Sequence, residues 1–86
     1  MAQVYRTSGS VLAADGTPLA GAYVTIKDAS VQVPEIAVQT DANGRFELRL
    51  PQGTFLLRAY AGDRIIDAHI TNSGEDGVDI VMRGAD

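Results

Sequence analysis

The segment from Thr40 to Leu57 constrains the fold of this chain more than any other part. It opens with Asp41 to Gly44, a sequence typical of a tight turn because glycine supplies the positive φ that such turns require. From Arg45 to Leu50 charged and apolar residues alternate, which is the period of a strand with one buried face. Pro51 to Gly53 breaks the alternation, and a second apolar run follows. This pattern predicts an all-β domain.

Similar short runs flank that segment, and nine glycines punctuate the chain. No window has a sustained helical period, so the rhythm predicts short strands joined by turns. The seven expected strands are Gln3–Ala13, Gly21–Asp28, Glu35–Thr40, Arg45–Leu50, Thr54–Ala61, a sixth with Ile66, Ala68 and Ile70 facing the core, and a seventh with Val78, Ile80 and Met82. Ala29–Pro34 is expected to be a loop or weak edge strand, Asn72–Gly77 a loop, and Gly84–Asp86 a tail.

Seven strands without a helix predict a two-sheet β-sandwich or a small barrel. We expect one domain over residues 1–86, with its core at about 3–83, excised from a larger protein. The break at Pro51 to Gly53 has two interpretations. A hairpin would place Glu47 opposite Arg58, an attractive pair, whereas a corner would carry the chain from one sheet to the other.

Composition excludes several classes of function. A net charge of −4 with seven scattered basic residues argues against nucleic acid as a partner. The absence of cysteine excludes thiolate catalysis and Cys-ligated zinc. No apolar run approaches the length of a membrane span, and the N-terminus lacks the apolar core of a signal peptide, so we expect no membrane insertion.

The polar residues offer no catalytic constellation. His69, the single histidine, shares the outward face of its strand with Ile65, Asp67 and Thr71, where we expect a solvated side chain. The pattern from Asp41 to Glu47 has a superficial likeness to a calcium loop, but Arg45 stands where an oxygen ligand is needed. We therefore predict that the chain is not an enzyme and has no catalytic residue, no cofactor and no metal.

Apolar side chains are in surplus at outward positions. Tyr23, Leu56, Tyr60 and Ile65 would form one exposed patch beside Arg58 if the second, fifth and sixth strands share a sheet. Tyrosine and arginine are favoured at the centres of protein interfaces. These five residues are the candidate protein-binding site. Two further apolar residues are assigned outward, Leu12 and Val81.

Four ordered motifs carry a resemblance to a known family: Gly9-x-Val11, Asp15-x3-Leu19-x-Gly21-Ala22-x-Val24-x-Ile26, Thr40-Asp41-x-Asn43-Gly44-x-Phe46-x-Leu48 and Leu50-Pro51-x-Gly53-x-Phe55-x-Leu57. With them the chain, from about Ser8 to Met82, resembles the carboxypeptidase regulatory-like domain of the transthyretin-like (prealbumin-like) superfamily. Phe55 departs from the tyrosine common there. The resemblance implies a seven-stranded Greek-key sandwich with an inter-sheet corner at Pro51 to Gly53.

Members similar to this chain are accessory modules beside carboxypeptidase catalytic domains, in outer-membrane receptors, in surface adhesins and on secretion-system spikes. The resemblance therefore implies a non-enzymatic adaptor that docks to a protein partner or a neighbouring domain, or a rigid spacer, in an exported or cell-envelope protein of bacteria. A carbohydrate-binding module of an exported enzyme or receptor is one alternative, because Tyr23 and Tyr60 are suited to stack on sugar rings. The other is a purely structural domain, or one that forms homo-oligomers through edge strands.

Overall fold

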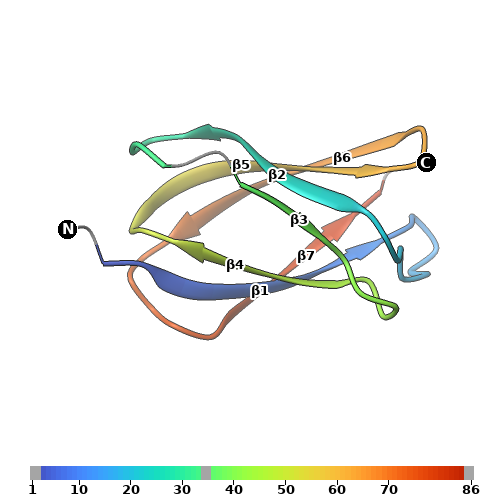
Figure 1. The fold of residues 1–86 in the computed structure, drawn as a ribbon, viewed down its shortest axis with the longest axis horizontal. Helices are drawn as coiled ribbons and strands as arrows, with labels where there is room; N and C mark the ends of the chain where they lie inside the picture. The colour runs from blue at the N-terminus through green and yellow to red at the C-terminus, as the bar shows by residue number, and fades with distance from the viewer. Residues whose placement is uncertain (1–2, 34–35, 85–86) are drawn as a thin grey trace.

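Seven strands and no helix run through residues 3–33 and 36–84, the part of the chain that this computed structural model describes (Figure 1). Accordingly, no helix in this part is long and apolar enough to cross a membrane. The strands are β1 (Tyr5–Leu12), β2 (Tyr23–Ala29), β3 (Ala37–Gln39), β4 (Arg45–Leu50), β5 (Gly53–Ala61), β6 (Arg64–Asn72) and β7 (Val78–Arg83).

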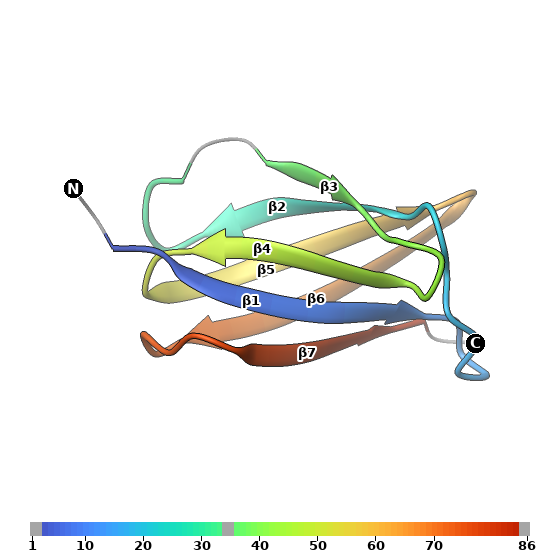
Figure 2. The same ribbon diagram turned by 60° about the horizontal axis from the view of Figure 1, so that its bottom comes forward.

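The strands form two sheets, ordered β4-β1-β7 and β3-β2-β5-β6. All neighbouring strands are antiparallel except β1 and β7, which run parallel. The two sheets lie face to face, with β1, β4 and β7 in front of β5 and β6 in the view of Figure 2. The expected two-sheet sandwich is thereby confirmed, and the barrel alternative is wrong.

Several expected strand ends are wrong by one or two residues. β1 begins at Tyr5 and ends at Leu12, where an isolated bridge to Pro18 starts the turn that follows. Asn72, assigned to a loop, is the last residue of β6 and is buried. The predicted third strand is shorter than expected, and its first residue, Glu35, lies outside the described residues together with Pro34.

The chain crosses between the sheets at Pro51 and Gln52, since β4 and β5 lie in different sheets. The hairpin interpretation is therefore wrong, and the corner implied by the family resemblance is confirmed. Glu47 pairs with Arg6 (Nε to Oε1, 3.5 Å) and does not face Arg58. Asn72 holds the corner from the other sheet, because its Nδ2 donates to the carbonyl oxygens of Leu50 at 3.0 Å and Pro51 at 3.2 Å.

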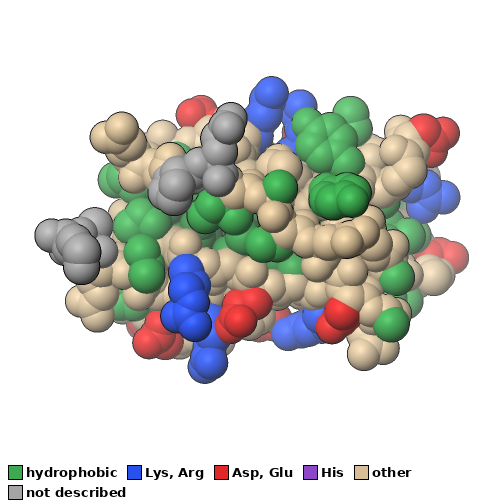
Figure 3. All heavy atoms as spheres, in the orientation of Figure 1, with side chains coloured by type: hydrophobic (Ala, Val, Ile, Leu, Met, Phe, Trp, Pro, Cys, Tyr) green, Lys and Arg blue, Asp and Glu red, His purple; other side chains and the backbone are tan. Residues whose placement is uncertain are grey.

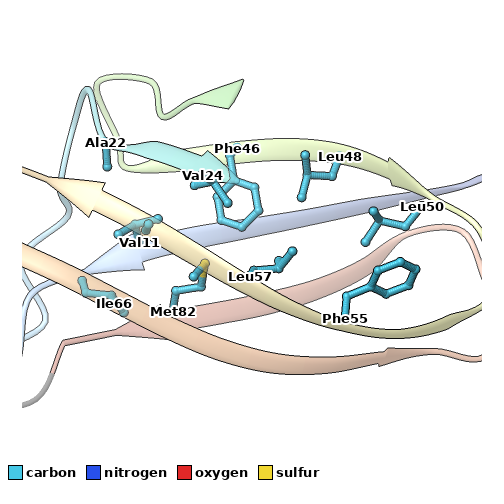
Figure 4. Close-up of a cluster of buried hydrophobic side chains, with 11 residues drawn as sticks. Val11, Ala22, Val24, Phe46, Leu48, Leu50, Phe55, Leu57, Ile66 and Met82 are labelled. Carbon is cyan, nitrogen blue, oxygen red and sulfur yellow. The ribbon is translucent and has the colours of Figure 1, made fainter. Parts of the chain in front are cut away.

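The core lies between the two sheets, and side chains from six strands point into it (Figure 4). The alternation expected in β4 is confirmed, because its apolar residues are buried and its charged residues exposed. The main buried side chains are Val11, Val24, Phe46, Leu48, Leu50, Phe55, Leu57, Ile66 and Met82. Two threonines are also buried in this layer, Thr7 and Thr40.

Glycine is required at two positions, Gly9 in β1 and Gly44 in the turn before β4. Gly9 lies under the ring of Phe46, where an added Cβ would stand 2.5 Å from Cζ of that ring. Gly44 has a φ of 72°, and a Cβ added to it would stand 2.9 Å from the carbonyl oxygen of Val11. In the same turn Asp41 Oδ1 accepts the backbone N–H groups of Asn43 and Arg45, both at 2.9 Å. The carboxylate that looked like a calcium ligand thus orders the turn.

Candidate functional site

The outer face of the β3-β2-β5-β6 sheet brings three of the five predicted site residues together. Tyr23 on β2 lies opposite Tyr60 on β5, and Tyr60 lies opposite Ile65 on β6. Side chains paired in this way are about 5 Å apart at Cβ, so these three form a continuous strip, here called the Tyr–Tyr–Ile row. Their exposed fractions are 52%, 38% and 59%, respectively. β2, β5 and β6 share one sheet, as the patch expected from the sequence requires.

Arg58 occupies the next outward position on β5, and it is paired with Asp67 on β6. Its Nε donates to Oδ1 at 2.8 Å and its Nη2 to Oδ2 at 3.0 Å, a bidentate arrangement that fixes the plane of the guanidinium. The hydrogen bond from Arg58 lowers the pKa of Asp67 below its ordinary value. The same bond, with a smaller contribution from Tyr60, raises the pKa of Arg58. A fixed ion pair therefore borders the Tyr–Tyr–Ile row.

Leu56 lies apart from the other apolar site residues. It is half-buried and stands opposite His69, one row beyond the Arg58–Asp67 pair. It lines a shallow hollow of about 440 Å³ with Asp28, His69 and other residues at that end of the sheet. The patch expected from the sequence is thus divided, with an ion pair between Leu56 and the Tyr–Tyr–Ile row.

A bulge in β2 produces a feature that the sequence did not predict. The register with β5 shifts between Ile26 and Asp28, so that Lys27 is an extra residue. A hollow of about 520 Å³ lies beside this bulge, between β2 and the short strand β3. Its lining consists of Thr25, Ile26, Lys27, Ile36, Ala37 and Tyr60. We call it the β2–β3 hollow. Since Tyr60 belongs to both features, the hollow adjoins the Tyr–Tyr–Ile row.

In the view of Figure 3, hydrophobic side chains reach the surface over β2 and β3, while charged side chains gather mainly along the upper and lower margins. Lys27 is exposed, as expected from its position outside the core. The β2–β3 hollow therefore combines the apolar residues Ile26, Ile36 and Ala37 with the polar residues Thr25, Lys27 and Tyr60.

His69 lies where the alternation predicted, exposed on β6 in the same outward series as Ile65, Asp67 and Thr71. Among the residues that the structure describes, no three His, Asp or Glu side chains are close enough to hold a metal ion together. Val81 is exposed to 59% on the other sheet, and Leu12 is half-buried. Neither of the two adds to the Tyr–Tyr–Ile row.

The strand order, the corner and the two-layer core define a β-sandwich of the prealbumin-like fold. The family model of the carboxypeptidase regulatory-like domain matches residues 6–83. The chain belongs to that family, whose members are non-catalytic accessory domains, and the resemblance read from the sequence motifs is confirmed. No curated protein matches the chain.

Solved structures share the fold at low sequence identity. A DUF3823 family protein from Parabacteroides merdae superposes with a TM-score of 0.73 over 96% of this chain, at 16% identity. Catechol 1,2-dioxygenases from Acinetobacter sp. and Pseudomonas arvilla give TM-scores of 0.66 and 0.68 over 85% and 98% of it, at 17% and 18% identity. The chain spans 46%, 37% and 53% of these three proteins, respectively.

Proposed function

We propose that this domain is a non-enzymatic docking module that binds a folded protein surface through the Tyr–Tyr–Ile row and the adjoining β2–β3 hollow. The observation that carries the proposal is the register that aligns Tyr23, Tyr60 and Ile65 across three neighbouring strands. Exposed apolar residues scattered over a surface are ordinary, whereas a contiguous strip beside a hollow is typical of interaction sites.

The chemistry of the hollow indicates what the partner would present. An apolar side chain of the partner would enter the β2–β3 hollow, between Ile36, Ala37 and the ring of Tyr60. A carboxylate beside it would meet the ammonium group of Lys27, which is exposed. The Arg58–Asp67 pair is already satisfied, so it would orient polar groups at the margin without leaving an unpaired charge in the interface.

The larger setting proposed for the module is a bacterial surface or secretion-spike protein, where it would act as an adaptor or spacer. Support for this setting is the known occurrence of the family as an accessory domain. The fold also forms only part of the three solved chains described above, 37% to 53% of their lengths. A neighbouring domain is therefore a suitable partner for the proposed face.

Capture from a lysate of the source organism tests the docking face when two matched variants are compared. Tyr23→Ser/Tyr60→Ser removes the aromatic centre of the row, and Val81→Ser removes an apolar residue of the opposite sheet that is more exposed than either tyrosine. We expect a protein that the wild type and Val81→Ser retain and that the double variant loses, with direct binding then reproduced by the purified partner. Equal capture by all three forms, all of them folded by circular dichroism, would place the interface elsewhere.

Carbohydrate binding is the second candidate, because Tyr23 and Tyr60 lie directly opposite one another and are both exposed. Paired aromatic rings can stack against the apolar faces of sugar rings. A glycan array distinguishes this function from docking: signals that disappear with Tyr23→Ser/Tyr60→Ser would favour it, and an array without signals would leave the protein partner as the conclusion.

A further inference from the structure

The outer edge of β6 is the longest free strand edge in the described part of the molecule. β6 has nine residues, against three in β3 and six each in β4 and β7. It pairs with β5 without a bulge from Asn72 to Arg64, and it contains no proline, glycine or lysine. Proteins keep such edges from pairing with short strands, bulges, proline or charged side chains, lysine above all. Of these devices β6 has only the charged side chains of Arg64, beside the turn, and Asp67, which is paired with Arg58.

The hairpin that joins β5 and β6 determines which backbone groups point away from the sheet. Its loop is Gly62 and Asp63, so Ala61 and Arg64 form the closing hydrogen-bonded pair. Hydrogen-bonded and non-hydrogen-bonded pairs alternate from there along the ladder. The backbone N–H and C=O groups that face outward therefore belong to Ile65, Asp67, His69 and Thr71. No backbone hydrogen bond to the turns and loops of the described structure occupies them.

The sequence of β6 is complementary to itself when a second copy runs antiparallel with Ala68 at the centre. Asp67 then lies opposite His69 of the second copy, and the symmetry repeats this pair on the other side. The imidazole can donate to the carboxylate, which has acceptor capacity left beyond its two bonds to Arg58. Because Asp67 and His69 both point their backbone groups outward, each such pair can exchange two N–H···O=C bonds.

The inner face of β6 fits the same register. Ile66 would lie opposite Ile70 of the second copy, and Ala68 opposite its own equivalent. Ala68 and Ile70 are partly exposed at the margin of the core, so a second copy would cover apolar surface that β6 now leaves open. A one-residue slip of one strand is excluded, because it would set outward backbone groups against inward ones and turn side chains to the wrong face. Moving the centre to Asp67 would bring two carboxylates together.

We propose that the free edge of β6 is a self-association site, at which two copies of this domain pair antiparallel about Ala68 and join their four-stranded sheets into one. The site is separate from the Tyr–Tyr–Ile row in its central contacts, since Tyr23 and Tyr60 lie on β2 and β5. The two proposals can therefore fail independently.

Sedimentation equilibrium at protein concentrations up to about 1 mM tests the pairing. His69→Pro removes an outward N–H that β5 does not use, so the fold is retained while the dimer weakens by about tenfold or more. His69→Asp sets like charges opposite each other and also weakens the dimer, whereas Asp67→His/His69→Asp restores opposite charges and recovers association relative to His69→Asp. Tyr60→Ala leaves the association unchanged.

Three results would overturn the proposal. A wild type that stays monomeric up to that concentration shows that the edge does not pair. A dimer that persists in folded His69→Pro and His69→Asp uses another surface. A dimer lost in Tyr60→Ala and kept in the β6 variants assigns self-association to the Tyr–Tyr–Ile row. If His69→Pro fails to fold, the comparison of His69→Asp with the charge swap decides.

Discussion

Arg58 and Asp67 face each other across β5 and β6, joined by two hydrogen bonds of 2.8 and 3.0 Å between the guanidinium and the carboxylate. Their position divides the outer face of the sheet, with the Tyr–Tyr–Ile row on one side and Leu56 on the other. The pair also fixes one side of the proposed docking face before any partner arrives, which lowers the entropy lost on binding.

The pH dependence of stability should report this pair. The pKa of Asp67 is lower in the folded protein than its ordinary value, so the pair stabilises the fold above the pKa of the unfolded carboxyl, about 4. This contribution is lost as pH falls through the folded pKa. We expect Asp67→Asn to be less stable than the wild type at neutral pH, with the difference closing as pH falls through the lowered pKa of folded Asp67. Urea unfolding at several pH values measures it.

Asp63→Asn is the matched control for that series, because it removes the same charge from the exposed turn of the same hairpin. A difference between Asp67→Asn and wild type that stays constant from neutral to acidic pH would contradict the assigned role of the ion pair.

Two buried threonines should respond in opposite directions to the same substitution. Thr7 Oγ1 is buried without a hydrogen-bond partner, whereas Thr40 Oγ1 donates to the carbonyl of Leu19 at 2.7 Å and accepts the N–H of Ala22 at 2.8 Å. We expect Thr7→Val to raise the free energy of unfolding by about 1 kcal/mol and Thr40→Val to lower it by about 1–3 kcal/mol. Chemical denaturation of both variants gives the signs, and equal losses would refute the distinction.

The close contact of Gly9 and Phe46 predicts a specific double-mutant cycle. A methyl group at Gly9 would meet the ring of Phe46 at 2.5 Å and Ile80 Cγ1 at 2.8 Å. We expect Gly9→Ala to lower the free energy of unfolding by about 1–3 kcal/mol through overpacking. Phe46→Leu makes room, so Gly9→Ala should cost less in that background. Additive effects of the two substitutions would show that the ring is not the obstacle.

Asn72 should control the stability of the inter-sheet corner. Its side chain donates to Leu50 and Pro51, and its Oδ1 accepts the N–H of Gly74 at 3.0 Å. We expect Asn72→Ala to lower the free energy of unfolding by about 2–3 kcal/mol, because buried backbone groups lose their partners. Hydrogen exchange should increase most at the corner and at Gly74. Asn43→Ala, in an exposed turn, serves as the control, and a similar loss there would argue against a special role for Asn72.

The sequence predicted the parts of this structure that depend on local periodicity. The alternation from Arg45 to Leu50 and the turn at Asp41 to Gly44 appear as expected, since each depends on neighbouring residues alone. The corner at Pro51 to Gly53 could not be decided from the residues, because a hairpin and a crossing both tolerate Pro-Gln-Gly. The pairing that excludes the hairpin joins residues far apart in the chain, such as Arg6 with Glu47.

The candidate site was predicted only in part, because local alternation shows which residues point outward but not how distant strands pair. Tyr23, Tyr60 and Ile65 were assigned outward by alternation, and the registers align them. Leu56 is separated because Arg58 lies between it and Tyr60 on the outward face of β5. The β2–β3 hollow lies beside the bulge at Lys27, and no glycine or proline in β2 indicates that bulge. The role of Asn72 was also missed, although an asparagine two residues before Gly74 was a signal of a side chain that bonds to the following turn.

The parallel pairing of β1 and β7 has a mechanical consequence. Residues from Thr7 to Leu12 lie beside Val78 to Arg83 in the same direction, so the described chain enters at one end of this strand pair and leaves at the other, as the arrows of β1 and β7 in Figure 1 show. Tension between the two ends pulls the strands past each other along their length and loads the hydrogen bonds between them together. In a hairpin pulled from its ends, the bonds would open one after another. The long axis of the molecule, 38 Å, is thus also the direction in which the sandwich resists extension.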